Sequence, residues 1–480
     1  MESIWSKSIS LKKHSPLKGD ISTNTVVIGG GITGLLTAYR LKEKGIKCVV
    51  IEAETICNKQ TKNTTAKITS QHGVLYSKIR SFYGEEAAKE YAYENQKAIE
   101  DYKNLIEKHH ISCCFEKKKA VLYSLKDAGV IEKEADAAKK AGIECYLTHK
   151  TELPFPVKSA LVFENQAQFN PLAFLSAISE ELEIYENTKA LKVENNIVYT
   201  DKGNISAQNI VFSCHFPFVN FPGLYFLRLN QERSYAVSSK WNKELKGMYI
   251  DAANGFSFRA YKNNIIIGGG ASRTGKMEGQ NPFELIEKKG KMWFQDFKTE
   301  YQWSAQDCIS LDGIPYIGRF IQANPNIFVA TGFNKWGMTS AMVSANLISD
   351  MVCGIKNYEN SIFSPSRFSI FASLKNICTN TVQTVKGFSK YLDYSNLKAK
   401  DIKQETAGII KYKGEKCGAY RCKDGNLYIV SLKCPHLKCI LNWNAATKTW
   451  DCPCHGSRYD YKGNLLDNPA QENSILIARI

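Results

Sequence analysis

The chain has 480 residues and a formal net charge of +16, and 44% of its residues are hydrophobic while 23% are charged. This length exceeds one small module and predicts about three domains, and no uninterrupted apolar run approaches the roughly 18 residues that span a bilayer. The N-terminal residues lack both a secretory apolar stretch and a twin arginine, so we expect a cytoplasmic location. No basic block is interleaved with base-stacking aromatic residues, so the charge does not predict nucleic-acid binding.

Residues 24–53 have the pattern of a strand, a tight glycine turn, a helix and a second strand. In the spacing Gly29-x-Gly31-x-x-Gly34, the first glycine permits the turn, the second lets the backbone approach a pyrophosphate, and the third allows close helix–strand packing. Glu52 ends the second strand, where a carboxylate binds ribose hydroxyls and repels a 2′-phosphate, which argues against NADP. The segment therefore predicts a Rossmann-type site for FAD or NAD.

Four later segments resemble parts of the D-amino-acid-oxidase and glycine-oxidase superfamily of flavoproteins, namely TTAKITSQHG (64–73), FENQAQFNPLAFLSAI (163–178), IVFSCHFPF (210–218) and residues 311–339. The resemblance extends from about residue 20 to about residue 354 and implies FAD as the cofactor. One departure is that the family's usual Ala-Thr-Gly reads Ser213-Cys214-His215 here. That change concerns a local contact and not the expected fold.

The resemblance also implies which residues line the flavin, namely Thr64, Thr65, Lys67, Gly332, Gly337, Met338 and Thr339. Lys67 has an alternative interpretation as a solvated surface lysine. The helix expected to start at Gly337 suits the negative charge that a reduced isoalloxazine ring develops near its N1 and O2 atoms.

Residues 81–145 and 225–305 are expected to form the substrate domain, because the second range contains half-buried strand patterns. The resemblance implies hydride removal from the carbon beside an amine, with an arginine fork holding a substrate carboxylate. We expect Arg259 in this role, with Tyr261 beside it in the pocket. Lesser candidates for this pocket are Arg273, Tyr235, Tyr249, His72 and His215, and the alternative for all of these residues is a structural or surface role.

Residues 365–404 place apolar side chains at near-helical spacing with lysines between them. The pattern predicts an amphipathic helix that packs on the flavin domain and carries the last domain. A basic helix of this kind also suits an anionic membrane, which would allow peripheral contact with the inner face and bring a quinone within reach.

Near the end of the chain, Cys434-x-His436 and Cys452-x-x-His455 offer two thiolates and two imidazoles on two loops. This is the ligand set of a Rieske 2Fe-2S cluster, with the cysteines on one iron and the histidines on the other. Zinc is the alternative for two cysteines and two histidines. A Rieske oxygenase would need a further mononuclear iron site, which the remaining histidines do not form.

The resemblance to respiratory and photosynthetic Rieske proteins implies a disulfide between Cys439 and Cys454. It also implies hydrogen bonds from Ser457 and Tyr459 that raise the cluster potential. Lys438 stands where the first Rieske box usually has a glycine.

The predicted fold class is α/β, a Rossmann-type FAD-binding domain with an α+β substrate domain, followed by an all-β Rieske domain. The expected boundaries are 20–360 for the oxidoreductase, with FAD-binding parts 20–80, 146–224 and 306–360, then 361–404 for the connector and 405–480 for the Rieske domain. We expect oxidation of an amine or amino acid, with electrons passing from FAD to the cluster and on to a protein, quinone or oxygen acceptor. The alternatives are an oxygen-using oxidase with a structural or sensing cluster, and an electron-transfer module without a small substrate.

Overall fold

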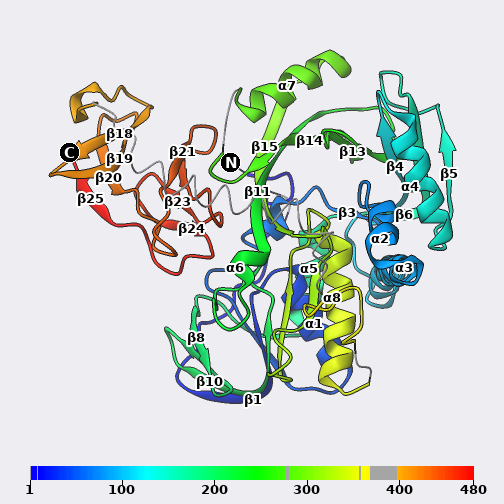
Figure 1. Ribbon diagram of the computed structural model, residues 1–480, viewed down its shortest axis with the longest axis horizontal. Coiled ribbons are helices and arrows are strands. Elements are labelled where there is room, and N and C mark those ends of the chain that lie inside the picture. The colour runs from blue at the N-terminus through cyan, green and yellow to red at the C-terminus, as the bar shows by residue number, and fades with distance from the viewer. Residues whose placement is uncertain (1, 8, 277–279, 356–357, 368–396) are drawn as a thin grey trace.

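A computed structural model describes residues 2–7, 9–276, 280–355, 358–367 and 397–480. The chain forms two large sheets with helices, and a smaller β module at the C-terminal end that packs beside them (Figure 1). The predicted α/β fold with a C-terminal all-β domain is confirmed.

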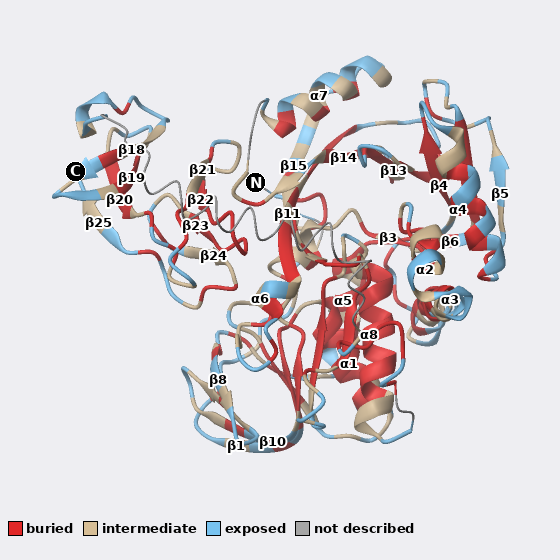
Figure 2. Ribbon diagram, in the orientation of Figure 1, coloured by how far each residue is buried: buried red, intermediate tan, exposed pale blue. Residues whose placement is uncertain are grey.

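The first sheet has eight strands in the order β16-β17-β10-β1-β2-β7, with β9 and β8 continuing from β10. Strands β1, β2, β7, β10 and β17 run parallel. Helices α1, α5 and α8 lie against this sheet, and Figure 2 shows that α1 and α8 are mostly buried. The elements are β1 (Ile21–Ile28), α1 (Ile32–Glu43), β2 (Cys48–Ile51), α5 (Pro171–Glu180), β7 (Glu183–Tyr185), β8 (Ala190–Glu194), β9 (Ile197–Thr200), β10 (Asn204–Phe212), β16 (Tyr316–Arg319), β17 (Ile327–Thr331) and α8 (Gly337–Val352).

The second sheet has nine strands in the order β15-β11-β14-β13-β12-β4-β6-β3, with β5 paired to β6. It curves over the end of the first sheet, and helix α7 covers one part of it while α2, α3 and α4 gather at the other (Figure 1). Its strands are β3 (Lys67–Ile68), β4 (Glu116–Ser124), β5 (Cys145–Thr148), β6 (Ser159–Gln168), β11 (Leu229–Lys240), β12 (Gly247–Asp251), β13 (Ser257–Tyr261), β14 (Asn264–Arg273) and β15 (Thr299–Ser310). Its helices are α2 (Tyr76–Tyr83), α3 (Glu85–Lys108), α4 (Ala128–Lys140) and α7 (Pro282–Trp293), and short helical turns elsewhere are η1 (Gln60–Asn63) and α6 (Tyr225–Arg228).

One expected boundary differs from the structure. Strands β5 and β6 lie inside the range 146–224 that the sequence assigns to FAD binding, yet both belong to the second sheet. Strand β6 pairs with both β4 and β3, so it belongs to the second sheet. The chain returns to the first sheet only at α5, which begins at Pro171.

The C-terminal module consists of two four-stranded antiparallel sheets in the orders β18-β19-β20-β25 and β21-β22-β23-β24. It follows η3 (Ala399–Asp401), and its strands are β18 (Ala407–Tyr412), β19 (Glu415–Arg421), β20 (Leu427–Ser431), β21 (Asn442–Asn444), β22 (Thr449–Asp451), β23 (Arg458–Asp460), β24 (Leu465–Asp467) and β25 (Leu476–Arg479). The two loops that carry the cysteine and histidine pairs follow β20 and β22.

Most of the predicted amphipathic connector, residues 368–396 of the range 365–404, lies outside the described residues. Just before it, Arg367 makes a buried two-point ion pair with Asp312, with Nε–Oδ2 and Nη2–Oδ1 distances of 2.9 and 3.1 Å. Burial raises the pKa of the Asp312 carboxyl, but the charge of Arg367 and the hydrogen bonds from Arg367, Tyr83 and the Ile314 amide together outweigh this effect and lower the pKa to about 2. Among the described helices, none is long and apolar enough to cross a membrane.

Candidate active site

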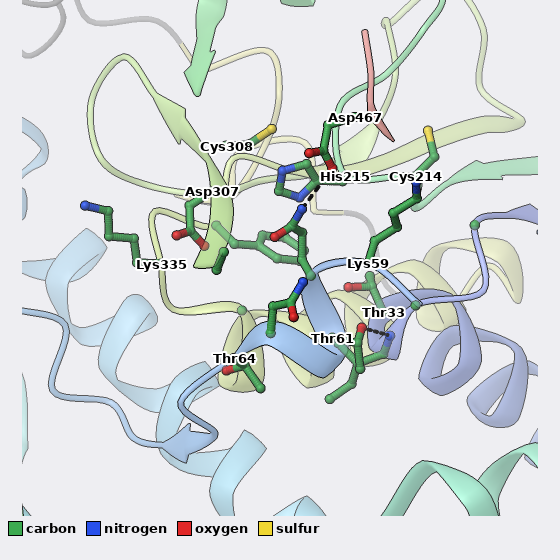
Figure 3. Close-up of a pocket in the computed structure, with 18 of the residues that line it drawn as sticks. Thr33, Lys59, Thr61, Thr64, Cys214, His215, Asp307, Cys308, Lys335 and Asp467 are labelled. Atoms are coloured by element: carbon green, nitrogen blue, oxygen red, sulfur yellow. Dashed lines mark hydrogen bonds between the residues drawn. The ribbon is translucent and has the colours of Figure 1, made fainter. Parts of the chain in front are cut away.

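A cavity of about 970 Å³ lies between the two sheets, and part of its wall comes from the C-terminal module. It extends from the glycine turn after β1 to the start of α8. Figure 3 shows Lys335 and Asp307 on one side, Thr33 and Thr61 at the glycine-turn end, and Asp467 close to His215. Such a volume lies at the upper end of the range for cofactor pockets.

At the glycine end of the cavity, backbone geometry and close contacts explain why two of the motif positions, Gly29 and Gly34, are glycine. Gly29 has φ +115°, and a Cβ atom there would lie 2.7 Å from the Ser213 carbonyl oxygen. A Cβ atom on Gly34 would lie 1.9 Å from the Gly29 carbonyl oxygen, so this glycine permits the close contact of α1 with β1. Gly29 and Gly31 line the cavity, and α1 begins directly after Gly31 with its N-terminus available to a phosphate.

Glu52 lines the same end of the cavity. Its Oε2 accepts a hydrogen bond from the Gly30 amide at 2.8 Å and its Oε1 accepts one from the Glu54 amide at 3.0 Å. Burial raises the pKa of Glu52, and these two hydrogen bonds oppose that effect. The carboxylate is thus fixed at the end of β2, in the position where a ribose would meet it.

At the other end, Thr64, Thr65 and Lys67 line the cavity, as do Gly332, Gly337 and Met338. Thr339 does not line it, because its hydroxyl donates to the Thr69 carbonyl at 3.0 Å. His72 holds the same corner together: its Nε2 lies 2.6 Å from the Thr69 oxygen, its Nδ1 lies 2.6 Å from Tyr91 Oη, and its ring stacks on Trp336. Thr339 and His72 therefore stabilise the start of α8 without lining the cavity.

Lys67 is half-buried in the cavity wall. Burial and, after it, the charge of Arg259 lower the pKa of Lys67 to about 7. A lysine with this pKa can exchange a proton at neutral pH, which an ordinary surface lysine cannot do.

Arg259 lies behind the cavity wall and is 1% exposed. Its Nη1 donates to the carbonyl oxygens of Thr65 and Ala66 at 2.7 and 2.6 Å, and its guanidinium lies over the rings of Trp5 and Tyr261. Neither Arg259 nor Tyr261 lines the cavity. The Nη2 group of Arg259 is buried without a hydrogen-bond partner in the described chain, and its role toward a substrate carboxylate stays a prediction.

Of the lesser candidates from the sequence, some line the cavity and others do not. Tyr235 lines the cavity, whereas the Tyr249 hydroxyl donates to Glu152 at 3.2 Å and lies elsewhere. Arg273 bonds to the second cysteine–histidine loop, with Nε 3.2 Å from the Pro453 oxygen and Nη2 3.0 Å from the Cys454 oxygen. In this structure Arg273 therefore holds the C-terminal module.

The cysteine–histidine loops form a second site. The rings of His436 and His455 lie 5.0 Å apart and nearly perpendicular. The Nδ1 atom of each ring is buried without a hydrogen-bond partner among the described residues, as expected of imidazoles that bind a metal through this atom. Burial lowers the pKa of His436 to about 4 and that of His455 to about 3, so both imidazoles are neutral, as metal binding requires.

The two cysteines face one another on the other side of this site. A hydrogen bond from Cys452 lowers the pKa of the Cys434 thiol to about 6, and Tyr459 Oη lies 3.6 Å from Cys434 Sγ. A disulfide joins Cys439 to Cys454, which confirms the predicted bridge. The four donor atoms do not gather within 4.8 Å of one another in the described chain, whereas ligands of one tetrahedral zinc would. The arrangement fits the predicted 2Fe-2S cluster, which would supply one-electron chemistry.

The histidine side of this site faces the flavin-binding part of the chain. His436 Nε2 lies 3.0 Å from Asn220 Oδ1, and the Phe226 ring meets both histidine rings edge-on. Gln231 Nε2 donates to the carbonyl oxygen of His455 at 2.8 Å. The histidine side of this site is therefore in direct contact with the first part of the chain.

Side-chain amides connect the module to the cavity. Gln306 Nε2 donates to the Gly456 oxygen at 2.8 Å and to Gln231 Oε1 at 2.6 Å. Asn468 Nδ2 donates to the oxygens of Cys214 and Phe216 at 3.1 and 2.7 Å. The sequence analysis missed these three amides, because single Gln and Asn residues carry no motif.

The loop and strand around β24 close one side of the cavity. Lys59 Nζ donates to the Leu466 oxygen at 2.6 Å, and Gln60 Nε2 donates to Asp467 Oδ1 at 3.2 Å. Residues 465–468, 470, 471 and 473 line the cavity beside the glycine end. The C-terminal module is therefore part of the wall of the first site.

A Rossmann-type pocket under a curved, mainly antiparallel sheet, joined to a paired Cys/His module, defines a flavoprotein oxidoreductase fused to a Rieske domain. Residues 24–351 match the FAD dependent oxidoreductase family, and residues 393–478 match the Rieske [2Fe-2S] domain family. The chain therefore belongs to the FAD-dependent oxidoreductase family, and the predicted cofactors, FAD and a Rieske 2Fe-2S cluster, are confirmed.

One relative and two solved structures match most of this chain. YhfW of Bacillus subtilis (strain 168), which is named as a Rieske 2Fe-2S iron-sulfur protein, is 35% identical over 98% of this chain and 96% of its own length. The structure of glycine oxidase from Geobacillus kaustophilus is similar with a TM-score of 0.62, 15% identity and coverage of 72% of this chain and 99% of that one. L-amino acid deaminase from Proteus vulgaris gives a TM-score of 0.60, 16% identity and coverage of 75% and 100%. At these identities the solved structures indicate the fold alone.

Proposed function

We propose that this protein oxidises an amine or amino acid and passes the electrons through its own Rieske cluster to an external acceptor. One observation carries this proposal: the module that holds the cluster site also forms part of the wall of the flavin cavity. Bound FAD would accept a hydride from the carbon beside the amine nitrogen, and the cluster would accept electrons one at a time.

Lys67 supports an amine as the substrate class. A substrate ammonium must lose a proton before its carbon can release a hydride, and a half-buried lysine with a pKa of about 7 can accept that proton. The similar folds of glycine oxidase and L-amino acid deaminase, whose names record amino-acid chemistry, point to the same class. A role of Arg259 toward the substrate carboxylate stays a prediction, because its Nη2 is buried with no partner in the described chain but the residue does not line the cavity.

The test is anaerobic mixing of the holoprotein with a panel of amines and amino acids, following flavin bleaching and the reduced-cluster EPR signal together. We expect one class of compound to bleach the flavin, after which the cluster signal grows. A flavin that bleaches while the cluster stays oxidised, although dithionite still reduces it, would replace this proposal by the oxygen-using oxidase. If no compound bleaches the flavin but a reduced protein partner does, the electron-transfer module is the better description.

A further inference from the structure

The turn that follows β10 has an unusual backbone at His215. This residue has φ +69°, and the Phe216 amide donates to the Cys214 carbonyl at 2.8 Å, which closes a three-residue turn around it. In such a turn the central residue is strained unless it is glycine. This chain therefore holds a histidine at a backbone position that favours glycine.

The side chain of His215 points into the flavin cavity. Figure 3 shows its ring beside Asp467, and its Nε2 is buried without a hydrogen-bond partner among the described residues. Burial lowers the pKa of His215, and the nearby Asp467 carboxylate and Gln231 side chain oppose that effect. The Thr331 hydroxyl holds the turn through the His215 carbonyl at 2.5 Å.

Asn468 and Gln231 connect the His215 turn to the cluster loop. Asn468 Nδ2 donates to the carbonyl oxygens of Cys214 and Phe216 at 3.1 and 2.7 Å. Gln231 Nε2 donates to the carbonyl oxygens of His455 and Asn468, both at 2.8 Å. Its Oε1 accepts from Gln306, which also binds the Gly456 oxygen. A Cβ atom on Gly456 would lie 2.6 Å from the Gln231 Cβ, so the two backbones approach closely at this point. Each contact in this chain of residues is either covalent or a hydrogen bond.

We propose that His215, Asn468 and Gln231 form the electron bridge from the flavin cavity to the cluster ligand His455. This inference rests on the proposed function, in which reduced flavin supplies the cluster. In each transfer one electron leaves the reduced flavin, one ferric ion of the cluster becomes ferrous, and a flavin proton is released to water. The histidine supplies the π-system at the cavity end, which explains why the strained position is not a glycine.

The experiment is photoreduction of the flavin in the holoprotein with a photosensitiser and a sacrificial donor, so that no substrate is needed. Flavin reoxidation is followed by absorbance, and cluster reduction by freeze-quench EPR. In His215→Gly we expect the internal transfer rate to fall roughly tenfold, with both reduction potentials unchanged. Because glycine relieves the strained φ, we also expect the Tm of this variant to rise by a few degrees.

Two further variants make the result specific to the bridge. His215→Asn tolerates the positive φ and keeps a hydrogen-bonding group, so we expect it to recover part of the rate. His110→Gly is the matched control, because His110 is exposed and has φ +49° but lies far along the chain in the loop after α3. It should leave the transfer rate at the wild-type value.

A His215→Gly protein that transfers at the wild-type rate overturns this inference, and so does a slowing that shifted potentials fully explain. A wild-type protein whose photoreduced flavin never reduces the cluster overturns both the inference and the proposed function. Transfer in the wild type that is slowed in His215→Gly and partly restored in His215→Asn supports the bridge.

Discussion

The cluster site and the flavin cavity both contain buried polar atoms without partners, but they distribute them differently. In the cluster site the two orphan atoms, Nδ1 of His436 and of His455, belong to rings 5.0 Å apart. In the flavin region they include Nη2 of Arg259, Nε2 of His215 and Oγ of Ser234, in different strands and loops near a cavity of about 970 Å³. The first site thus gathers its orphan atoms as one compact group requires, whereas the second distributes them around a large cavity.

The largest effect should come from breaking the compact site. Cys452→Ser removes a thiolate that the cluster needs, so we expect complete loss of the Rieske EPR signal with flavin content unchanged. Cys417→Ser is the control, since Cys417 is also buried in the module but lies outside the two loops. A variant that keeps its cluster signal would show that Cys452 is not a ligand.

A substitution in the flavin cavity should change the rate of flavin reduction and leave the cofactor content unchanged. We expect Lys67→Met to lower the rate of flavin reduction by substrate about 100-fold, as loss of a proton acceptor does. With a pKa of about 7, wild-type Lys67 is protonated in acid and neutral in base, so the wild-type rate should rise with pH through about 7. Stopped-flow reduction across pH tests this, with Lys62→Met as the control. A pH profile that survives in Lys67→Met would assign the proton acceptor elsewhere.

A smaller effect should come from the contact between the two regions. Arg273→Met removes two charge-assisted hydrogen bonds to the Pro453 and Cys454 carbonyls and should destabilise the docked module by about 2 kcal/mol. Chemical denaturation followed by the visible absorbance of the cluster measures this. Arg80→Met, which breaks an exposed ion pair with Asp136, should destabilise the protein clearly less than Arg273→Met does. Equal losses in both variants would mean that Arg273 does not hold the module.

The smallest effect should be a tuning of the cluster. Tyr459→Phe removes the hydroxyl 3.6 Å from Cys434 Sγ. Loss of a hydrogen bond worth about 1 kcal/mol lowers a one-electron potential by about 40 mV. Tyr461→Phe, on the same hairpin but outside the site, should leave the potential unchanged in a redox titration. An unchanged reduction potential in Tyr459→Phe would show that this hydrogen bond does not tune the cluster.

The same contrast explains what the sequence could predict. The cluster ligands and the glycine turn depend on residues close together in the chain, so spacing alone indicated their chemistry. The position of Arg259 depends on which way strand β13 faces and on the loop carbonyls of Thr65 and Ala66 behind it, which no local pattern reveals. The amides of Gln231, Gln306 and Asn468 act only because three distant segments meet. The place of β6 in the second sheet likewise depends on its partners β3 and β4.

The wall that residues 465–473 contribute to the flavin cavity has a consequence for how the molecule is assembled. A ligand that binds only the closed arrangement stabilises it in proportion to the logarithm of its concentration over Kd. FAD bound beneath this wall therefore strengthens the attachment of the Rieske module, and a docked module increases the affinity for FAD by the same free energy. A chain without flavin is accordingly expected to hold its Rieske module more weakly than the FAD-bound protein does.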